Sequence, residues 1–347
     1  MKFGLFDHID RNDRPLAVQF DERLRFIAAA DEAGFYCYHL AEHHASPLNT
    51  TPRPGVFLAA VARATKRIHL GPLVYLLPLY SPLAMVEEIS MLDHLSNGRL
   101  EVGIGRGVSP FELKHHKVSA EESRDIFIDA FHCVSEGLTH DKLTYKGKYF
   151  DYKEVPIALR PLQRPHPAFW YGSSNATGST WAGEEGLHFA TNGGVARAKA
   201  NIASYNEALA KRGKPAQPKA EFPGGAAIGV SRQVVVADTD EAAAAIAKPA
   251  FAHLYANLTY LARLNVGDEL VVRQSVPVSA SFEDAVREGT IIAGSPATVA
   301  EKLAQQKHEL GINYMLTYLM FGTMALPDAL RSLALFSTEV MPKLAAL

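Results

Sequence analysis

Three consecutive side chains in the first fifty residues carry the most direct chemistry. Glu42, His43 and His44 follow a short apolar stretch that ends at Ala41. Histidine titrates near neutral pH, so an imidazole beside a carboxylate can move protons or hold an anion. Because adjacent residues of a strand point to opposite faces, one histidine is expected to face a site and the other to point away. A purely structural hydrogen-bonding role for one or both histidines is the alternative.

A metal site is a second use of the same region. Asp7 and His8 could join Glu42 and a histidine as ligands. Two adjacent histidines chelate poorly, and the sequence has neither a His-x-His nor a His-Glu-x-x-His spacing. We therefore predict that no metal is bound. His115 and His116 lie in a polar segment and are expected to be surface residues.

Two further segments have the composition of an anion-binding site. The glycines of residues 103–107 (GIGRG) have no side chains, so a ligand can approach the backbone there. In the same segment the guanidinium of Arg106 is permanently charged and can donate two hydrogen bonds to one anion. Residues 172–177 (GSSNAT) lead into a helix, and the N–H groups at a helix start bind phosphate. Each segment also has an ordinary explanation, a structural ion pair for Arg106 and a simple N-cap for the serines. If the two segments follow neighbouring strands, they predict a phosphate site.

These residues must be positioned by a regular framework, and the chain has one. Short apolar runs alternate with amphipathic stretches, which is typical of a parallel sheet with crossover helices. Eight parallel strands predict a closed α/β barrel of the TIM (β/α)8 type. In such a barrel the active site lies at the carboxyl ends of the strands. A doubly wound open sheet is the competing architecture, but no change of composition marks two halves. The eight predicted strands cover residues 2–6, 36–41, 68–77, 100–104, 168–171, 187–190, 226–237 and 313–318.

The connections between these strands complete the predicted fold, which we take as a single domain over residues 1–347. Residues 263–289 lack a strand-helix rhythm, so we predict an insertion before the last strand that covers the barrel mouth. Residues 105–110 differ from the dinucleotide fingerprint because a loop containing Ser109-Pro110 intervenes. The predicted helices cover residues 20–33, 56–64, 82–97 and 122–138, with a hairpin over 143–152.

Composition narrows the class of ligand and the compartment. A hydrophobic fraction of 48% excludes a predominantly disordered chain. The 35 Lys and Arg residues are balanced by 37 Asp and Glu residues, so no basic surface for binding nucleic acid or a membrane is expected. The two cysteines are far apart, which is typical of a reducing compartment. The first residues lack the pattern of an export signal, and no apolar run approaches the roughly 20 residues of a membrane helix. We expect a cytoplasmic protein with a small-molecule substrate.

The sequence resembles the bacterial luciferase-like flavin monooxygenases over nearly its whole length. The resemblance implies an eight-stranded barrel that uses reduced flavin mononucleotide (FMN) and dioxygen to oxidise a small organic substrate through a flavin hydroperoxide. The matching segments are MKFGLF (1–6), GFYCYHLAEHH (34–44), LGPLVYLLPLYSPLAMVEEISMLDHLSNGRLEVGIGRG (70–107), AGSPATVAEKL (293–303) and LFSTEVMP (335–342).

The resemblance also implies roles for individual residues. His43 corresponds to the histidine that acts in acid/base steps or stabilises the oxygenated intermediate, with Glu42 and His44 beside it. Leu73-Val74 corresponds to a cis peptide bond beneath the flavin ring. Gly105 stands where light-emitting luciferases have cysteine, so light emission is not implied. The residues that the resemblance assigns to the flavin are Leu73, Val74, Gly105, Arg106, Gly172, Ser173, Ser174 and Thr177.

Partners and alternatives follow from the same resemblance. The chain has no nicotinamide fingerprint of its own, so reduced FMN is expected to come from a separate flavin reductase. Family members are often dimeric, which implies a homodimer by analogy. Two other functions fit the same barrel: a deazaflavin-dependent hydride-transfer enzyme, and a non-catalytic flavin-binding protein.

Overall fold

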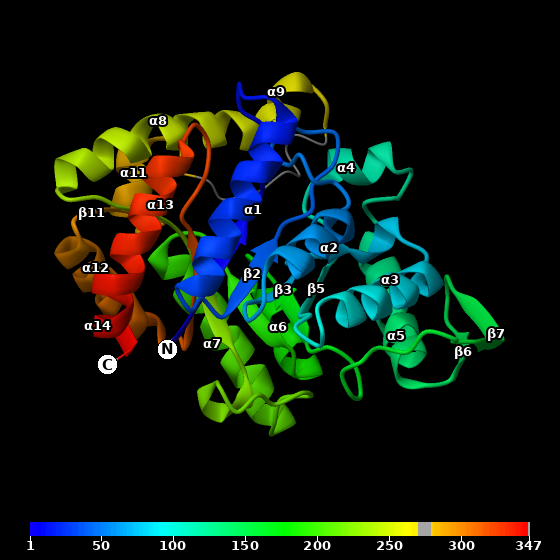
Figure 1. The fold of residues 1–347 in the computed structure, drawn as a ribbon. Coiled ribbons are helices and arrows are strands. Elements are labelled where there is room, and N and C mark those ends of the chain that lie inside the picture. Colours follow the sequence, from blue (N-terminus) through cyan, green and yellow to red (C-terminus); the bar gives the residue numbers. More distant parts are fainter. Residues whose placement is uncertain (270–278, 346–347) are drawn as a thin grey trace.

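The structure is a computed structural model that describes residues 1–269 and 279–345. Parallel strands and the helices that connect them form a barrel (Figure 1). One position of the barrel is shared by two short successive strands, β3 (His69–Pro72) and β4 (Tyr75–Leu76). The other strands of the ring are β1 (Lys2–Asp7), β2 (Cys37–Leu40), β5 (Val102–Gly105), β8 (Phe169–Gly172), β9 (His188–Thr191), β10 (Ile228–Val236) and β12 (Tyr314–Tyr318).

Hydrogen bonds close this sheet into a ring. The strand order is β3-β2-β1-β12-β10-β9-β8-β5-β4, and all of these pairs are parallel. A parallel bridge joins Leu70 of β3 to Leu100. The Leu70 N–H donates to the Arg99 carbonyl (3.0 Å), and the Glu101 N–H donates to the Leu70 carbonyl (2.9 Å). The predicted eight-stranded α/β barrel is therefore confirmed.

One further parallel strand was not predicted from the sequence. Strand β11 (Ile291–Gly294) pairs with residues Gln233–Val236 at the end of β10. A four-residue apolar run is too short for its periodicity to identify a strand. Part of the described stretch of segment 263–289 is also regular, because it contains helix α11 (Phe282–Arg287). Residues 270–278, the centre of the predicted lid, lie outside the described residues.

Helices surround the barrel, and three of them lie at the carboxyl end of the strands. In Figure 1, α4, α8 and α9 lie at one end of the barrel, and both termini lie near the opposite end. Helix α4 corrects the prediction of a loop at Ser109-Pro110, because Ser109 caps it. The helices are α1 (Leu16–Glu32), α2 (Pro54–Ala64), α3 (Pro82–Leu95), α4 (Pro110–His115), α5 (Ser123–Thr139), α6 (Ala176–Glu185), α7 (Val195–Arg212), α8 (Asp240–Leu258), α9 (Tyr260–Leu264), α11, α12 (Pro296–Leu310), α13 (Leu326–Leu335) and α14 (Met341–Ala345).

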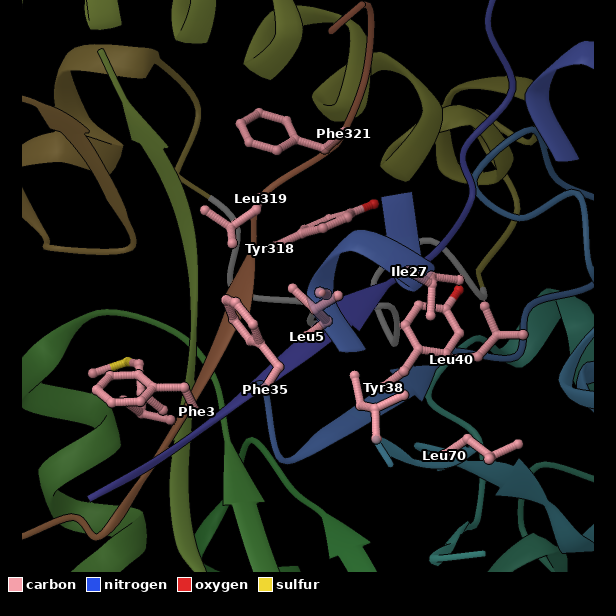
Figure 2. Packing of buried hydrophobic residues seen from close by; sticks show 14 of the residues in the cluster. Phe3, Leu5, Ile27, Phe35, Tyr38, Leu40, Leu70, Tyr318, Leu319 and Phe321 are labelled. Atoms are coloured by element: carbon pink, nitrogen blue, oxygen red, sulfur yellow. The ribbon is translucent and has the colours of Figure 1, made fainter. Parts of the chain in front are cut away.

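Apolar side chains join the outer face of the barrel to this helical layer. Figure 2 shows Leu5 of β1 and Tyr38 and Leu40 of β2 near Ile27 of α1. The predicted hairpin is present as strands β6 (Lys142–Lys146) and β7 (Asp151–Pro156), which pair antiparallel. Within the described residues, each helix is too short or too polar to cross a membrane.

A buried carboxylate fills the amino-terminal end of the barrel. The Glu101 carboxylate accepts hydrogen bonds from the Tyr36 hydroxyl (3.0 Å), Trp170 Nε1 (2.8 Å) and His69 Nδ1 (2.9 Å), and it pairs with Lys219. Burial alone would raise the pKa of Glu101, but the hydrogen bond from His69 and the charge of Lys219 outweigh it and hold the pKa well below 4.5. These contacts hold the Glu101 carboxylate directly before the start of β5.

Replacing Tyr36 with phenylalanine should test how much this network stabilises the fold. The change removes the hydrogen bond that Tyr36 donates to a buried carboxylate and the one that its hydroxyl accepts from Lys219 (3.3 Å). Because Glu101 keeps its other partners, we expect the free energy of unfolding to fall by about 1–2 kcal/mol. Urea denaturation measures this difference. Tyr149→Phe is the control, because the Tyr149 hydroxyl bonds an exposed carboxylate, that of Glu122. An equal loss in both variants would contradict a special role for the Glu101 network.

Candidate functional site

A cavity of about 310 Å³ opens at the carboxyl ends of the barrel strands. This volume is at the lower end of the range of small-molecule sites. Strand ends and the loops that follow them supply most of its lining, and α4, α8 and α9 close its sides. The lining includes Phe6, His8, Glu42, His43, Leu73, Val74, Gly105, Arg106, Glu112, Gly172, Ser173, Ser174, Phe251, Leu254, Leu261, Ser279, Leu316 and Tyr318.

Of the two adjacent histidines, His43 is the one that lines the cavity. A carboxylate from another element forms a hydrogen bond with its ring. Its Nδ1 lies 3.0 Å from Glu112 Oε1, on the first turns of α4. Burial alone would lower the pKa of His43, but the negative charge and hydrogen bond of Glu112, with a smaller contribution from Glu42, outweigh it and raise the pKa above 6.5. Glu112 therefore favours the protonated form of the His43 imidazole.

His44 does not line the cavity. Its Nε2 donates to Glu42 Oε1 (2.7 Å), and its ring meets that of His116 edge-on with the centroids 4.5 Å apart. The other Glu42 oxygen accepts the N–H of Leu76 (3.1 Å). Burial raises the pKa of Glu42, although its hydrogen bond to His44 acts in the opposite direction. Both Glu42 oxygens are thus occupied by protein groups, and we interpret Glu42 and His44 as support for the strand end that presents His43.

The alternative of a metal site finds no support in the positions of these groups. Asp7, one of its possible ligands, instead pairs with Arg23 (3.1 Å) and accepts the Tyr38 hydroxyl (3.0 Å). Within residues 1–269 and 279–345, no group of three or more His, Cys, Asp or Glu side chains is arranged to hold a metal ion.

A second imidazole, His8, shares the cavity with His43. The two rings stack with centroids 5.4 Å apart and an angle of 27° between their planes. His8 Nδ1 lies 3.3 Å from the Tyr318 hydroxyl. Burial, followed by the nearby charge of His43, lowers the pKa of His8 well below 6.5. The pKa values of the two cavity imidazoles are therefore displaced in opposite directions.

The floor of the cavity is built around a cis peptide bond. The Leu73–Val74 bond is cis, as the resemblance implies, and both residues line the cavity. Gly105 lies against this bond, since a methyl group added there would overlap Val74 Cγ2. A methyl group added at Gly172 would instead lie 3.6 Å from Val74 Cγ1, which is ordinary contact. Gly105 therefore leaves no room for a side chain beside Val74, whereas Gly172 does.

This difference predicts different effects for two similar substitutions. Gly105→Ala forces the stiff, β-branched side chain of Val74 to move, so we expect the free energy of unfolding to fall by about 1 kcal/mol. Gly172→Ala is the matched control and should leave it nearly unchanged. Denaturant titration of both variants makes the comparison. The packing argument is wrong if Gly172→Ala proves the more destabilising of the two.

The opposite side of the cavity carries donors for an anion. Arg106 is exposed after β5, and it has no hydrogen bond or ion pair within the described residues. Ser173 and Ser174 line the cavity directly before α6, whose N-cap is Asn175. Thr177 lies exposed in the first turn of α6 and does not line the cavity. An unpaired guanidinium thus lies in the same cavity as serine hydroxyls and a helix amino terminus, all of which favour an anion.

Some of these residues were missed by sequence reasoning. Glu112 was not singled out, although Ser109-x-x-Glu112 has the spacing of a helix capping box that would have indicated α4. His8 was weighed only as a metal ligand. Tyr318 lies at the end of the last strand and has no local signal that would distinguish it from core residues.

Sequence comparisons identify relatives of this chain. Residues 1–314 match a family model described as luciferase-like monooxygenase. The chain is 35% identical to protein y4wF of Sinorhizobium fredii over 345 residues, which are 99% of this chain and 97% of that protein. It is 29% identical over 195 residues to the oxygenase component of the flavin-dependent trigonelline monooxygenase of Acinetobacter baylyi, covering 54% of this chain and 53% of that one.

Solved structures share the fold. The oxygenating constituent of 3,6-diketocamphane monooxygenase from Pseudomonas putida, a type II Baeyer-Villiger monooxygenase solved in complex with FMN, superposes with a TM-score of 0.81 at 24% identity, covering 99% of this chain and 98% of that one. An F420-dependent secondary alcohol dehydrogenase superposes with a TM-score of 0.74 at 18% identity, with the same coverage. At these identities the likeness establishes the fold alone.

Proposed function

The chain belongs to the luciferase-like monooxygenase family, and from this membership we propose that it binds reduced FMN and uses dioxygen to oxidise a small organic substrate. One observation carries the proposal. A single cavity joins Arg106, which has no hydrogen bond or ion pair within the described residues, and its serine neighbours to the His43–Glu112 pair across the Leu73–Val74 floor. A separate reductase would supply the reduced flavin, as the description of one relative as an oxygenase component suggests.

The donors in the cavity suit FMN. Arg106, Ser173 and Ser174 would hold its phosphate, because a guanidinium fork and hydroxyl groups match the phosphate oxygens. The floor formed by Val74 and Gly172 would carry the flat ring system. When bound, reduced FMN supplies the electrons for activation of dioxygen. The apolar side chains of Phe251 and Leu254 on α8 would exclude water from the same space.

His43 is the proposed proton donor of the reaction. Its Nδ1 is engaged by Glu112, and its Nε2 has no hydrogen-bond partner within the described chain. The protonated ring can therefore donate from Nε2 to an oxygen atom in the cavity. Glu112 orients the ring and favours its charged form, so it acts as a positioning residue.

Glu112→Gln should shift the pH dependence of turnover. The activity carried by protonated His43 is lost as pH rises through its pKa. Removing the Glu112 charge lowers that pKa while burial remains, so the alkaline limb of the kcat profile should move to lower pH by about one unit. Glu136→Gln is the control, since Glu136 pairs with His140 on the surface. An unchanged profile in Glu112→Gln would contradict the positioning role.

Anaerobic titration with reduced FMN, followed by measurement of substrate-dependent oxygen uptake, tests the proposed function. Saturable binding and oxygen uptake that depends on the organic substrate are expected. Failure to bind reduced FMN would overturn the proposal.

A deazaflavin-dependent hydride transfer is the second candidate, favoured by the fold shared with an F420-dependent dehydrogenase. Titrating the two cofactors in parallel separates these functions, because each predicts tighter binding of its own cofactor. A flavin-binding protein without catalysis would bind FMN but consume no oxygen when substrates are added.

A further inference from the structure

Beneath the cavity, the interior of the barrel holds a row of aromatic side chains to which the proposed function assigns no task. Tyr314 of β12 packs in one cluster with Leu73 and Leu316, which line the cavity. The centroid of its ring lies 5.2 Å from that of Trp170 on β8 and 5.8 Å from that of Tyr36. Tyr36 belongs to the buried carboxylate network at the amino-terminal end of the barrel. Three oxidisable rings thus extend from beneath the cavity to that end.

Close packing fixes these rings in place. Tyr314 and Trp170 are fully buried, and Tyr36 is 9% exposed. Gly4 of β1 and Gly229 of β10 leave the space that Tyr314 fills. A methyl group added at Gly4 would overlap the Tyr314 hydroxyl, and one added at Gly229 would lie 3.1 Å from Tyr314 Cδ1. The distances between the rings are therefore held nearly constant, as transfer of an electron between them requires.

A shared carboxylate makes two of these rings easier to oxidise. Trp170 Nε1 donates to Glu101 Oε2 (2.8 Å), and the Tyr36 hydroxyl donates to Oε1 of the same side chain (3.0 Å). The negative charge of Glu101 favours a ring that has lost an electron, and the carboxylate can accept the proton that an oxidised tyrosine releases. The Tyr314 hydroxyl shares a hydrogen bond with His39 Nε2 (2.9 Å). Each ring of the row therefore has a hydrogen-bond partner at its polar atom.

The row ends close to solvent. The Tyr36 ring stacks on that of His69, with the centroids 4.9 Å apart and an angle of 14° between the planes. The side chain of His69 is 25% exposed. The side chain of Lys219, whose Nζ donates to the Tyr36 hydroxyl (3.3 Å), is 15% exposed. A reductant dissolved in water can thus approach to within one side chain of the Tyr36 ring.

We propose that Tyr36, Trp170 and Tyr314 conduct electrons from the amino-terminal end of the barrel to one-electron oxidants that form in the cavity. This inference rests on the proposed function, since activation of dioxygen is the source of the oxidant. The oxidant is a hydroxyl radical, which a peroxide releases when its O–O bond breaks homolytically instead of delivering oxygen to the substrate. Reduction of this radical before it attacks the cavity walls preserves side chains such as His43.

The electrons and protons of this step balance. The hydroxyl radical gains one electron from the row and one proton from solvent and becomes water. Tyr36 supplies the electron, its hydroxyl proton moves to Glu101, and Trp170 and Tyr314 are left unchanged. A thiolate in solution then returns one electron to Tyr36 and becomes a thiyl radical, while the proton moves back from Glu101.

Light provides a one-electron oxidant in the cavity without catalysis. When oxidised FMN bound to the protein absorbs a blue flash, its excited ring takes one electron from a nearby aromatic side chain. The chain has two tryptophans, Trp170 and Trp181 of α6, and a tryptophan radical is identified by its transient absorption. Under anaerobic conditions we expect this radical in the wild type, its loss in Trp170→Phe and its retention in Trp181→Phe. Trp181 is a stringent control, because its ring lies 4.9 Å from that of Tyr171, which lines the cavity.

Two further variants test the order of the row. Tyr314→Phe removes the oxidisable ring between the cavity and Trp170, so the yield of the tryptophan radical should fall. Tyr36→Phe removes the ring that re-reduces Trp170, so the radical should live longer. Tyr149→Phe changes a tyrosine bonded to an exposed carboxylate and should behave as wild type. Far-UV circular dichroism verifies folding, and these variants decide the proposal if Trp170→Phe does not fold.

The outcomes separate this inference from the proposed function, because FMN binding is measured first by fluorescence titration of the same samples. Failure to bind FMN would contradict the proposed function and this inference with it. With FMN bound, a radical that persists in Trp170→Phe or disappears in Trp181→Phe would overturn this inference alone. Equal radical lifetimes in the wild type and Tyr36→Phe would also overturn it, since electrons would then not come from the amino-terminal end of the barrel.

Oxidative damage tests the protective role directly. After repeated turnover, peptide mass spectrometry should find more oxidised His43 in Trp170→Phe than in the wild type or in Trp181→Phe. Equal oxidation of His43 in all three proteins would contradict protection by the row.

Discussion

His43→Ala is expected to lower kcat for substrate-dependent oxygen uptake by roughly 10²- to 10⁴-fold, the usual contribution of a positioned acid or base. The reason is geometric: His43 is the only residue of the Glu42-His43-His44 run whose imidazole lines the cavity. Steady-state kinetics at saturating reduced FMN measure the effect. The dissociation constant for FMN should change little, because the proposed phosphate site lies on other elements.

His115→Ala is the control for His43→Ala, since it removes an exposed imidazole on α4 that takes no part in the cavity. Loss of oxygen uptake in both variants would point to a general effect on folding. Unchanged turnover in His43→Ala would remove His43 from the chemistry. If the wild-type protein bound FMN and consumed no oxygen, the non-catalytic interpretation would be preferred.

The barrel was predictable from local pattern because each of its strands follows or precedes a helix with clear periodicity. The strand at residues 226–237 and the helix after it illustrate this, since branched residues give way to an alanine-rich stretch. Strand β11 was missed for the opposite reason. Its four residues, Ile291–Gly294, are recognisable only through their pairing with the end of β10, which lies more than fifty residues earlier.

The candidate site shows the same division between local and distant information. Gly105, Arg106 and the serine segment could be identified because a glycine-rich loop and a helix start have local signatures. Glu112 could not be assigned to His43, since the two are 69 residues apart and meet only when α4 folds over the end of β2. The contact between His8 and Tyr318 spans 310 residues and depends on closure of the barrel.

Arg106→Ala is expected to raise the dissociation constant for FMN by roughly 10- to 100-fold, because charge-assisted hydrogen bonds contribute about 1.5–3 kcal/mol. The free energy of unfolding should change by less than about 0.5 kcal/mol, since Arg106 is exposed and has no hydrogen bond or ion pair in the described part of the chain. Flavin fluorescence titration measures the first quantity and urea denaturation the second. Arg25→Ala, which removes an exposed arginine of α1, is the control.

Riboflavin provides the sharper comparison, because it has the ring system of FMN without the phosphate. If Arg106 holds the phosphate, Arg106→Ala should weaken FMN binding and leave riboflavin binding unchanged, so that the two ligands become similar in affinity. Added salt should weaken FMN binding to the wild type more than to the variant, since exposed charges are screened. An equal loss for FMN and riboflavin would show that Arg106 acts on the ring or on the shape of the loop, and the phosphate site would then have to rest on α6 alone.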